Sequence, residues 1–216
     1  MTHRSAEPTS APSSPAPTEA QAPVRRGWRT IDVMVTVTIG IAMGIVFMGL
    51  NYLYYPLDPL FKTFTPMQGI LAGLWFLPAI LAGVIVRKPG AALVAEILAA
   101  CVEMSVSQWG MSTMLSALFQ GLGAEIGFAV FAYRRFGFVP AAVAGIGAAV
   151  LEWGFEIVYS YGTWALDWKL IYLTIMAASG AVIAALVCVP LAKALAATGV
   201  LSSFRIGREH AERTRA

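Results

Sequence analysis

Residues 31–54 have the sequence IDVMVTVTIGIAMGIVFMGLNYLY, a strongly apolar stretch that is followed by Pro56. An α-helix rises 1.5 Å per residue, so a stretch of this length can cross a hydrocarbon layer of roughly 30 Å. A secretory signal would place a shorter apolar segment nearer the start of the chain. The stretch therefore predicts a first membrane-spanning helix.

Further apolar segments follow it, separated by short polar or basic turns. We expect membrane helices at 68–86, 91–107, 111–133, 140–161 and 168–197, with Pro78 as a kink in the first of these. The segment 91–107 is short and carries two glutamates, so hydropathy alone leaves a five-helix alternative open. The predicted fold class is all-α, an integral membrane bundle of six transmembrane helices.

Basic residues favour the six-helix count and set the orientation. With six helices most Lys and Arg side chains fall on one side of the membrane, whereas Lys62 and Lys169 fall on the other. Cytoplasmic loops carry the excess of positive charge, so both termini of this multi-pass cell-membrane protein are predicted to be cytoplasmic. The basic side contains Arg25, Arg26, Arg29, Arg87, Lys88, Arg134, Arg135, Arg205, Arg208 and Arg213.

The composition of the two ends differs from that of the apolar middle. Residues 1–26 are rich in Pro, Ser and Ala and are predicted to be a disordered cytoplasmic tail. Residues 27–198 form the predicted six-helix membrane domain, and residues 199–216 form a basic cytoplasmic C-terminal tail. The sequence thus predicts one membrane domain between two tails.

Composition also excludes several classes of protein. With 58% hydrophobic and 12% charged residues, the chain is too apolar for an ordinary soluble domain, and a net charge of +3 is too small to suggest nucleic-acid binding. Cys101 and Cys188 lie within apolar segments, which argues against a disulfide framework. His3 and His210 lie in the tails, which leaves no imidazole at membrane depth for catalysis, haem or metal binding. We expect no enzymatic activity, metal or cofactor in this chain.

Glutamates inside the apolar segments are the main functional signal. A charged carboxylate at the centre of a membrane helix costs roughly 2.5 to 3.5 kcal/mol, so these side chains must face an interior, pair or carry protons. No Lys or Arg lies in the middle of any predicted helix to pair with them. Residues spaced by four or seven share one helix face, which groups Glu152 with Glu156 and Glu96 with Glu103. The buried set is Glu96, Glu103, Glu125, Glu152 and Glu156.

Chain direction divides the set by depth and predicts an outward-facing pocket. Glu96 and Glu125 are expected in the cytoplasmic half, with structural or coupling roles. Aromatic rings near the other glutamates, including Trp153, favour an aromatic cationic ligand, because carboxylates supply charge and ring faces supply cation–π attraction. Alternatively, the glutamates bond to helix backbones, stay protonated, or form a proton relay. The candidate binding residues are Trp75, Glu103, Trp109, Gln120, Glu152, Glu156 and Tyr159.

Four sequence segments together resemble a known family. They are RKPGAALVAEILAACVE at 87–103, SQWGMSTML at 107–115, QGLGAEIGFAVFAYRRF at 120–136 and the pair Glu152-Trp153. The region 28–197 is similar to YkoE-type substrate-binding S components of energy-coupling factor (ECF) transporters, which are associated with thiamine or its hydroxymethylpyrimidine precursor. The resemblance implies a six-helix subunit that captures the vitamin from outside.

The resemblance also implies partners. A transmembrane T component and ABC-type ATPase subunits would assemble with the chain in the lipid bilayer, and ATP would be used by those ATPases. Gly40 and Gly44 form a GxxxG spacing that lets another helix approach closely. In S components small residues of the first helix contact the T component, which makes Gly40, Ala42 and Gly44 candidates for that interface. A solitary proton-coupled carrier and a structural membrane subunit without a ligand remain alternatives.

Overall fold

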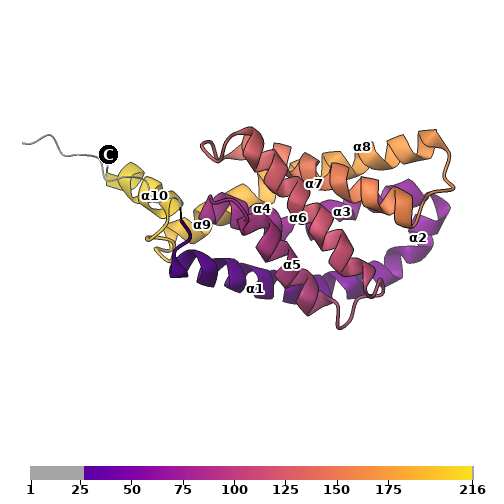
Figure 1. Cartoon of the computed structure of the whole chain (residues 1–216), viewed down its shortest axis with the longest axis horizontal. Coiled ribbons are helices and arrows are strands. Elements are labelled where there is room, and N and C mark those ends of the chain that lie inside the picture. Colours follow the sequence, from indigo (N-terminus) through magenta and orange to yellow (C-terminus); the bar gives the residue numbers. More distant parts are fainter. Residues whose placement is uncertain (1–26, 216) are drawn as a thin grey trace, which may run out of the picture.

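Helices make up the whole regular structure of the described residues, which are 27–215 of this computed structural model, and no strand occurs among them (Figure 1). The predicted tail at 1–26 therefore lies outside the described residues. The elements are α1 Thr30–Tyr54, η1 Tyr55–Leu57, α2 Asp58–Thr63, η2 Thr65–Gln68, α3 Gly69–Trp75, α4 Leu77–Val86, α5 Ala91–Glu103, α6 Ser112–Val130, α7 Phe138–Tyr159, α8 Leu166–Ile183, η3 Ala184–Cys188, α9 Val189–Ala197 and α10 Arg205–Arg215.

Five helical stretches in the described part of the chain are long and apolar enough to cross a membrane. They contain α1, α3 with α4, α6, α7, and α8 with α9, in agreement with the predicted segments. The predicted helix at 91–107 is present as α5, but its 13 residues correspond to about 20 Å, less than the hydrocarbon thickness. The chain is an all-helical, multi-pass membrane protein in which α5 is a short inner helix.

Two of the long helices are interrupted near proline residues. The segment at 68–86 breaks at Phe76, between α3 and α4, and Pro78 lies in the first turn of α4. Proline has no N–H and cannot continue a helix from the preceding turn, so the predicted kink at Pro78 is confirmed. In the last long helix a π-helical turn, Ala184–Cys188, precedes Pro190, and no feature of the sequence predicted that turn.

Helix α4 forms the centre of the bundle. All of its residues are buried, and it packs against α1, α5, α6, α7 and α9. A helix surrounded on every side by other helices has no face on which a charged residue is tolerated. This position explains why residues 77–86 are entirely apolar.

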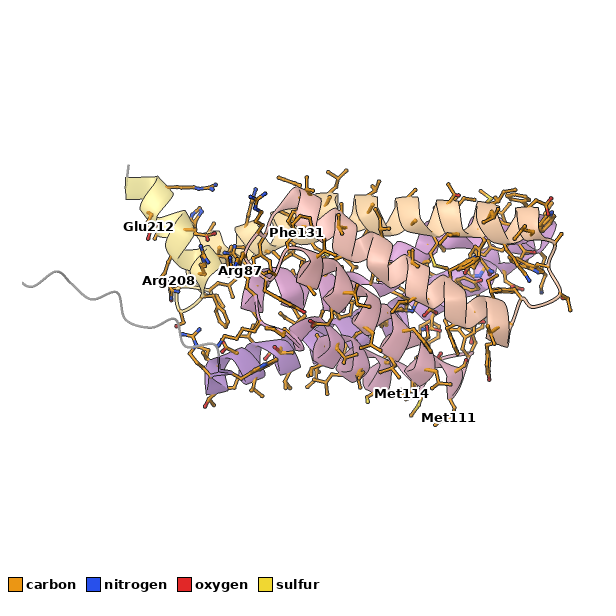
Figure 2. All side chains as sticks on the ribbon, turned by 45° about the horizontal axis from the view of Figure 1, so that its top comes forward. Arg87, Met111, Met114, Phe131, Arg208 and Glu212 are labelled. Atoms are coloured by element: carbon orange, nitrogen blue, oxygen red, sulfur yellow. The ribbon has the colours of Figure 1, made fainter. Side chains whose placement is uncertain are left out.

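The basic residues gather at one end of the bundle. Figure 2 shows Arg87, Phe131 and Arg208 at this end, with Met111 well away from it. The turn between α4 and α5 is bound to the start of α1, since Lys88 Nζ lies 2.5 Å from the buried Asp32 carboxylate. The start of α1, the turns after α4 and α6, and the C-terminal segment therefore share one end, as the predicted topology requires.

The C-terminal segment folds into helix α10, which projects from the basic end of the bundle (Figure 1). Arg87 holds it there by donating two hydrogen bonds to the Glu209 carboxylate, at 2.8 and 3.0 Å. The guanidinium of Arg87 also lies 5.0 Å from the ring centroid of Phe136, in the turn after α6. One arginine thus connects the turn after α4, the turn after α6 and the C-terminal helix.

Loss of the Glu209 charge should loosen α10. The hydrogen bonds from Arg87 hold the pKa of Glu209 below its ordinary value of 4.5. Their stabilisation is therefore present above that pH and is lost as the pH falls through the lowered pKa of the folded state. For a half-exposed pair it amounts to roughly 0.5 to 1 kcal/mol, so Glu209→Gln should speed amide hydrogen exchange in α10 about two- to fivefold. Glu212→Gln, on an exposed position of the same helix, is the control, and equal exchange in both variants would contradict the prediction.

The glycines of α1 face α5 of the same chain. A Cβ atom at Gly40 would lie 2.7 Å from Leu98 Cβ, and one at Gly44 would lie 2.6 Å from Val102 Cβ. The close approach that the GxxxG spacing predicted is thus present, but with α5 as the neighbouring helix. Of the three residues considered for a partner interface, Ala42 is the one that is exposed.

Candidate substrate-binding cavity

A cavity of about 180 Å³ lies between the helices at the end opposite the basic residues. All seven predicted binding residues line it: Trp75, Glu103, Trp109, Gln120, Glu152, Glu156 and Tyr159. They come from α3, α5, α6, α7 and the turn after α5. The fold therefore brings together residues that are far apart in the sequence.

Glu103 accepts two hydrogen bonds from neutral donors. Its Oε1 atom accepts hydrogen bonds from Asn51 Nδ2 at 2.5 Å and from Trp75 Nε1 at 2.9 Å. The side chain is 1% exposed, and neither donor carries a charge that would neutralise it. A buried carboxylate that accepts two N–H groups without a counter-ion is suited to attract a cation.

Aromatic rings surround this carboxylate. The rings of Trp75 and Trp109 meet edge to face with centroids 5.8 Å apart, and Tyr54 meets Trp109 in the same way at 5.4 Å. Phe47 lies 6.1 Å from Trp75 on the inner side. Such rings attract a cation through their faces, each by about 0.5 to 2 kcal/mol. The Glu103 side of the cavity therefore combines negative charge with stacking surfaces.

A second polar group lies deeper, around Glu152. Ser116 Oγ contacts Glu152 Oε1 closely, and Gln120 lies 2.7 Å from the same hydroxyl. Glu96 adjoins this group and accepts a hydrogen bond from the Ala79 backbone N–H at 2.9 Å. This bond agrees with the structural role predicted for Glu96, which also lines the cavity and is 1% exposed, although it was not among the candidate binding residues.

Glu156 and Tyr159, one turn apart on α7, also line the cavity. Glu156 Oε2 accepts a hydrogen bond of 2.6 Å from the hydroxyl of Tyr172, a buried residue of α8. Tyr159 is 62% exposed, and its ring stacks on Phe155 with centroids 5.2 Å apart. Glu156 thus belongs to the wall of the cavity, whereas Tyr159 lies at its rim.

A chain of three polar side chains crosses the mouth. Tyr54 donates to Gln68 Oε1 at 3.0 Å, and Gln68 Nε2 donates to the Tyr161 hydroxyl at 2.6 Å. These residues come from α1, η2 and the turn after α7. The mouth is therefore bounded by hydrogen bonds between segments that are distant in sequence.

Trp153 and Glu125, which were considered from the sequence together with the pocket glutamates, lie outside the cavity and have other roles. Trp153 does not line the cavity, and its Nε1 donates to the backbone oxygen of Lys169 at 2.8 Å. Glu125 accepts from the Ala92 N–H at 2.8 Å and from the Tyr133 hydroxyl, so it caps the start of α5. A carboxylate at a helix N-terminus is stabilised by the free N–H groups there. The structural role predicted for Glu125 agrees with this position.

Several lining residues were not singled out as binding candidates. Tyr54 and Tyr161 lie near the ends of apolar segments, where tyrosine is common at a membrane surface, and Tyr172 and Ser116 carried no signal of their own. Asn51, behind Glu103, could have been found as a polar residue on the buried face of an apolar helix. Among residues 27–215 no group of three or more His, Cys, Asp or Glu side chains is placed to hold a metal ion.

Comparisons with known proteins agree with this architecture. Residues 31–151 match the family described as "ABC-type cobalt transport system, permease component". The chain is 30% identical over 188 residues to the "Putative HMP/thiamine permease protein YkoE" of Bacillus subtilis (strain 168), covering 85% of this chain and 92% of that protein. It matches a crystal structure described as an S-component of an ECF transporter with a TM-score of 0.80 and 29% identity, covering 88% and 96% of the two chains.

Together with these comparisons, the fold and its cavity identify the chain as a membrane-embedded, substrate-binding subunit of a transporter, which is not an enzyme. Within that class, the chain belongs to the YkoE-type family of ECF transporter S components.

Proposed function

We propose that the chain captures thiamine or its hydroxymethylpyrimidine precursor from the outer face of the cell membrane. The observation that supports this most strongly is the position of Glu103, a buried carboxylate with two neutral donors beside Trp75 and Trp109. Thiamine has a permanently charged thiazolium ring and an aminopyrimidine whose amine suits carboxyl oxygens. The precursor keeps the aminopyrimidine and lacks the charge. The name of the Bacillus subtilis relative refers to the same two ligands.

The distribution of charge supports an orientation for this binding. The end that carries Arg29, Arg87, Lys88 and Arg208 is the cytoplasmic one by the positive-inside rule, so both termini are cytoplasmic. The cavity lies at the opposite end, where it opens to the outside. Substrate therefore enters from outside without crossing the buried helix α4.

Release into the cell requires partner subunits. A transmembrane T component and ABC-type ATPases are the proposed partners, and the ATPases would use ATP. Because Gly40 and Gly44 are covered by α5, the exposed side of α1 that carries Ala42 is the proposed contact with the T component.

Tryptophan fluorescence tests the ligand class. Trp75 and Trp109 line the cavity, so thiamine and hydroxymethylpyrimidine should each change the emission of the purified protein in a saturable way. Riboflavin, a vitamin without an aminopyrimidine, and Co²⁺, the metal in the description of the matched family, should not. No response to either pyrimidine together with saturable binding of riboflavin or Co²⁺ would overturn the ligand assignment.

Uptake into liposomes separates this function from that of a solitary carrier. A proton-coupled carrier would accumulate thiamine when this chain alone is reconstituted and a pH gradient is applied. The proposed capture subunit should bind thiamine under these conditions but should not accumulate it. Gradient-dependent uptake by the isolated chain would contradict the proposal.

A further inference from the structure

The break between α3 and α4 separates two backbone groups that an unbroken helix would pair. In an α-helix each N–H bonds to the carbonyl four residues earlier, which would join Ala79 to Trp75. Here the Ala79 N–H donates to Glu96 Oε2 at 2.9 Å, and the Trp75 carbonyl oxygen lies 3.2 Å from the side-chain amide of Gln120. Glu96 and Gln120 therefore supply the missing partners.

The Trp75 carbonyl fixes the orientation of the Gln120 amide. A carbonyl oxygen only accepts hydrogen bonds, so the amide group that faces it must be the NH₂ group. In this orientation the same NH₂ group lies 3.1 Å from Glu96 Oε1, which accepts from it. The amide oxygen then lies 2.7 Å from Ser116 Oγ and must accept the hydroxyl proton.

The single proton of Ser116 decides the state of Glu152. Because that proton goes to Gln120, the close contact between Ser116 Oγ and Glu152 Oε1 can be a hydrogen bond only if Glu152 donates it. Glu152 Oε2 is buried and has no hydrogen-bond partner among the described residues. Burying an oxygen without a hydrogen bond costs more free energy when it belongs to an ionised carboxylate than when it is the carbonyl oxygen of a neutral acid.

We propose that Glu152 is a neutral carboxylic acid and that its Oε2 atom accepts an N–H group of the ligand. The residue is 4% exposed and lines the cavity, so its unpartnered oxygen is available to accept a hydrogen bond from a bound ligand. The exocyclic amine of an aminopyrimidine has the required chemistry. This inference rests on the proposed function and divides the cavity: Glu103 serves the charge of the ligand, and Glu152 recognises its neutral amine.

The other ionisable groups of the cavity have different partners. Glu96 accepts hydrogen bonds at both oxygens, from Ala79 and Gln120. Glu156 accepts from Tyr172, which lies on α8 opposite α7. Glu152 is therefore the cavity glutamate whose own proton is needed to complete the network.

Infrared spectroscopy of the ligand-free protein tests the protonation without any ligand. At neutral pH the difference between wild type and Glu152→Gln should contain the carbonyl stretching band of a protonated carboxylic acid. Loss of a carboxylate band instead would overturn the proposal. Hydroxymethylpyrimidine should move the acid band to lower frequency, because its amine bonds to that carbonyl, and an analogue with methyl in place of the amine should not.

Binding to two variants tests the acceptor role. Glu152→Leu should weaken hydroxymethylpyrimidine binding about tenfold, because the ligand amine is left without an acceptor. Glu152→Gln keeps a donor toward Ser116 and an acceptor toward the ligand, so it should recover most of that loss. Equal losses in the two variants would show that a charge, and not a neutral acceptor, is required at this position.

The methyl analogue serves as a ligand-side control that also applies if Glu152→Leu does not fold. Wild type should bind the methyl analogue about tenfold more weakly than hydroxymethylpyrimidine. Glu152→Gln should show the same ratio between the two affinities. Equal affinity of wild type for amine and analogue would overturn the acceptor role. Failure of wild type to bind any pyrimidine would refute the proposed function, while the ligand-free infrared band would still decide the protonation of Glu152.

Discussion

Glu103→Gln should weaken thiamine binding about 30-fold or more and change hydroxymethylpyrimidine binding less than about threefold. The carboxylate is buried and accepts from Asn51 and Trp75, at 2.5 and 2.9 Å, through a single oxygen. In the variant the amide oxygen must take over these two bonds, which turns the NH₂ group toward the cavity. Removing one member of a buried charge pair costs about 2 to 5 kcal/mol, and each 1.4 kcal/mol is tenfold in affinity.

Isothermal titration calorimetry is the appropriate measurement, because the substitution alters the surroundings of Trp75 and hence its fluorescence. Glu125→Gln is the matched control, since it removes a carboxylate from the same bundle at a position outside the cavity. It should leave both dissociation constants unchanged. An equal loss of thiamine and hydroxymethylpyrimidine binding in Glu103→Gln would refute a charge role for this glutamate.

Glu156→Gln is expected to act in the same direction with a smaller effect. Its carboxylate accepts a hydrogen bond of 2.6 Å from the Tyr172 hydroxyl and lines the same cavity. Glu103, in contrast, bonds directly to Trp75, whose ring meets that of Trp109, so a cation stacked on these rings is expected to interact more strongly with Glu103. The order of the two losses therefore locates the charged ring of the ligand.

Features that depend on local sequence were predicted well. The long helices, the break near Pro78 and the gathering of basic residues at one end follow from hydropathy, the missing N–H of proline and the asymmetry of charge. Each of these is a property of one segment and the solvent around it. The seven candidate binding residues line one cavity, and for Glu103, Gln120, Glu152 and Glu156 this follows because a polar side chain in an apolar helix needs an interior to face.

Features that depend on two helices at once were not predicted. Glu96 was given a structural or coupling role and was not included among the binding candidates, but α5 packs against α4 and brings Glu96 to the break before that helix, where it lines the cavity. The free Ala79 N–H at that break draws the Glu96 carboxylate inward. The sequence shows the proline that makes the break, but it does not show which helix lies against it.

The GxxxG pair of α1 illustrates the same limit. Its spacing shows that a helix can approach closely, and it contains no information on whether that helix belongs to the same chain. In the structure the neighbour is α5, with Val102 against Gly44. A stability measurement on the isolated protein separates the two interpretations.

Gly44→Ala should destabilise the purified chain by about 1 to 3 kcal/mol. The new Cβ would lie 2.6 Å from Val102 Cβ and 2.8 Å from the backbone oxygen of Ala99. A backbone atom cannot move aside without displacing α5, so the cost is that of overpacking a filled core. At roughly 2 to 4 °C per kcal/mol for a chain of this size, a loss near 2 kcal/mol lowers the unfolding temperature in detergent by about 4 to 8 °C.

Gly49→Ala is the matched control, since it lies in the same helix and a Cβ there meets nothing within 4 Å. Alanine favours helix over glycine by about 0.5 to 1 kcal/mol, so this variant should be as stable as wild type or slightly more stable. If Gly44 instead served only a partner subunit, Gly44→Ala would match Gly49→Ala in isolation and would lose transport only in the assembled complex. Destabilisation of the isolated chain by Gly44→Ala alone would assign the glycine to the α1–α5 contact, on which the position of Glu103 beside Asn51 depends.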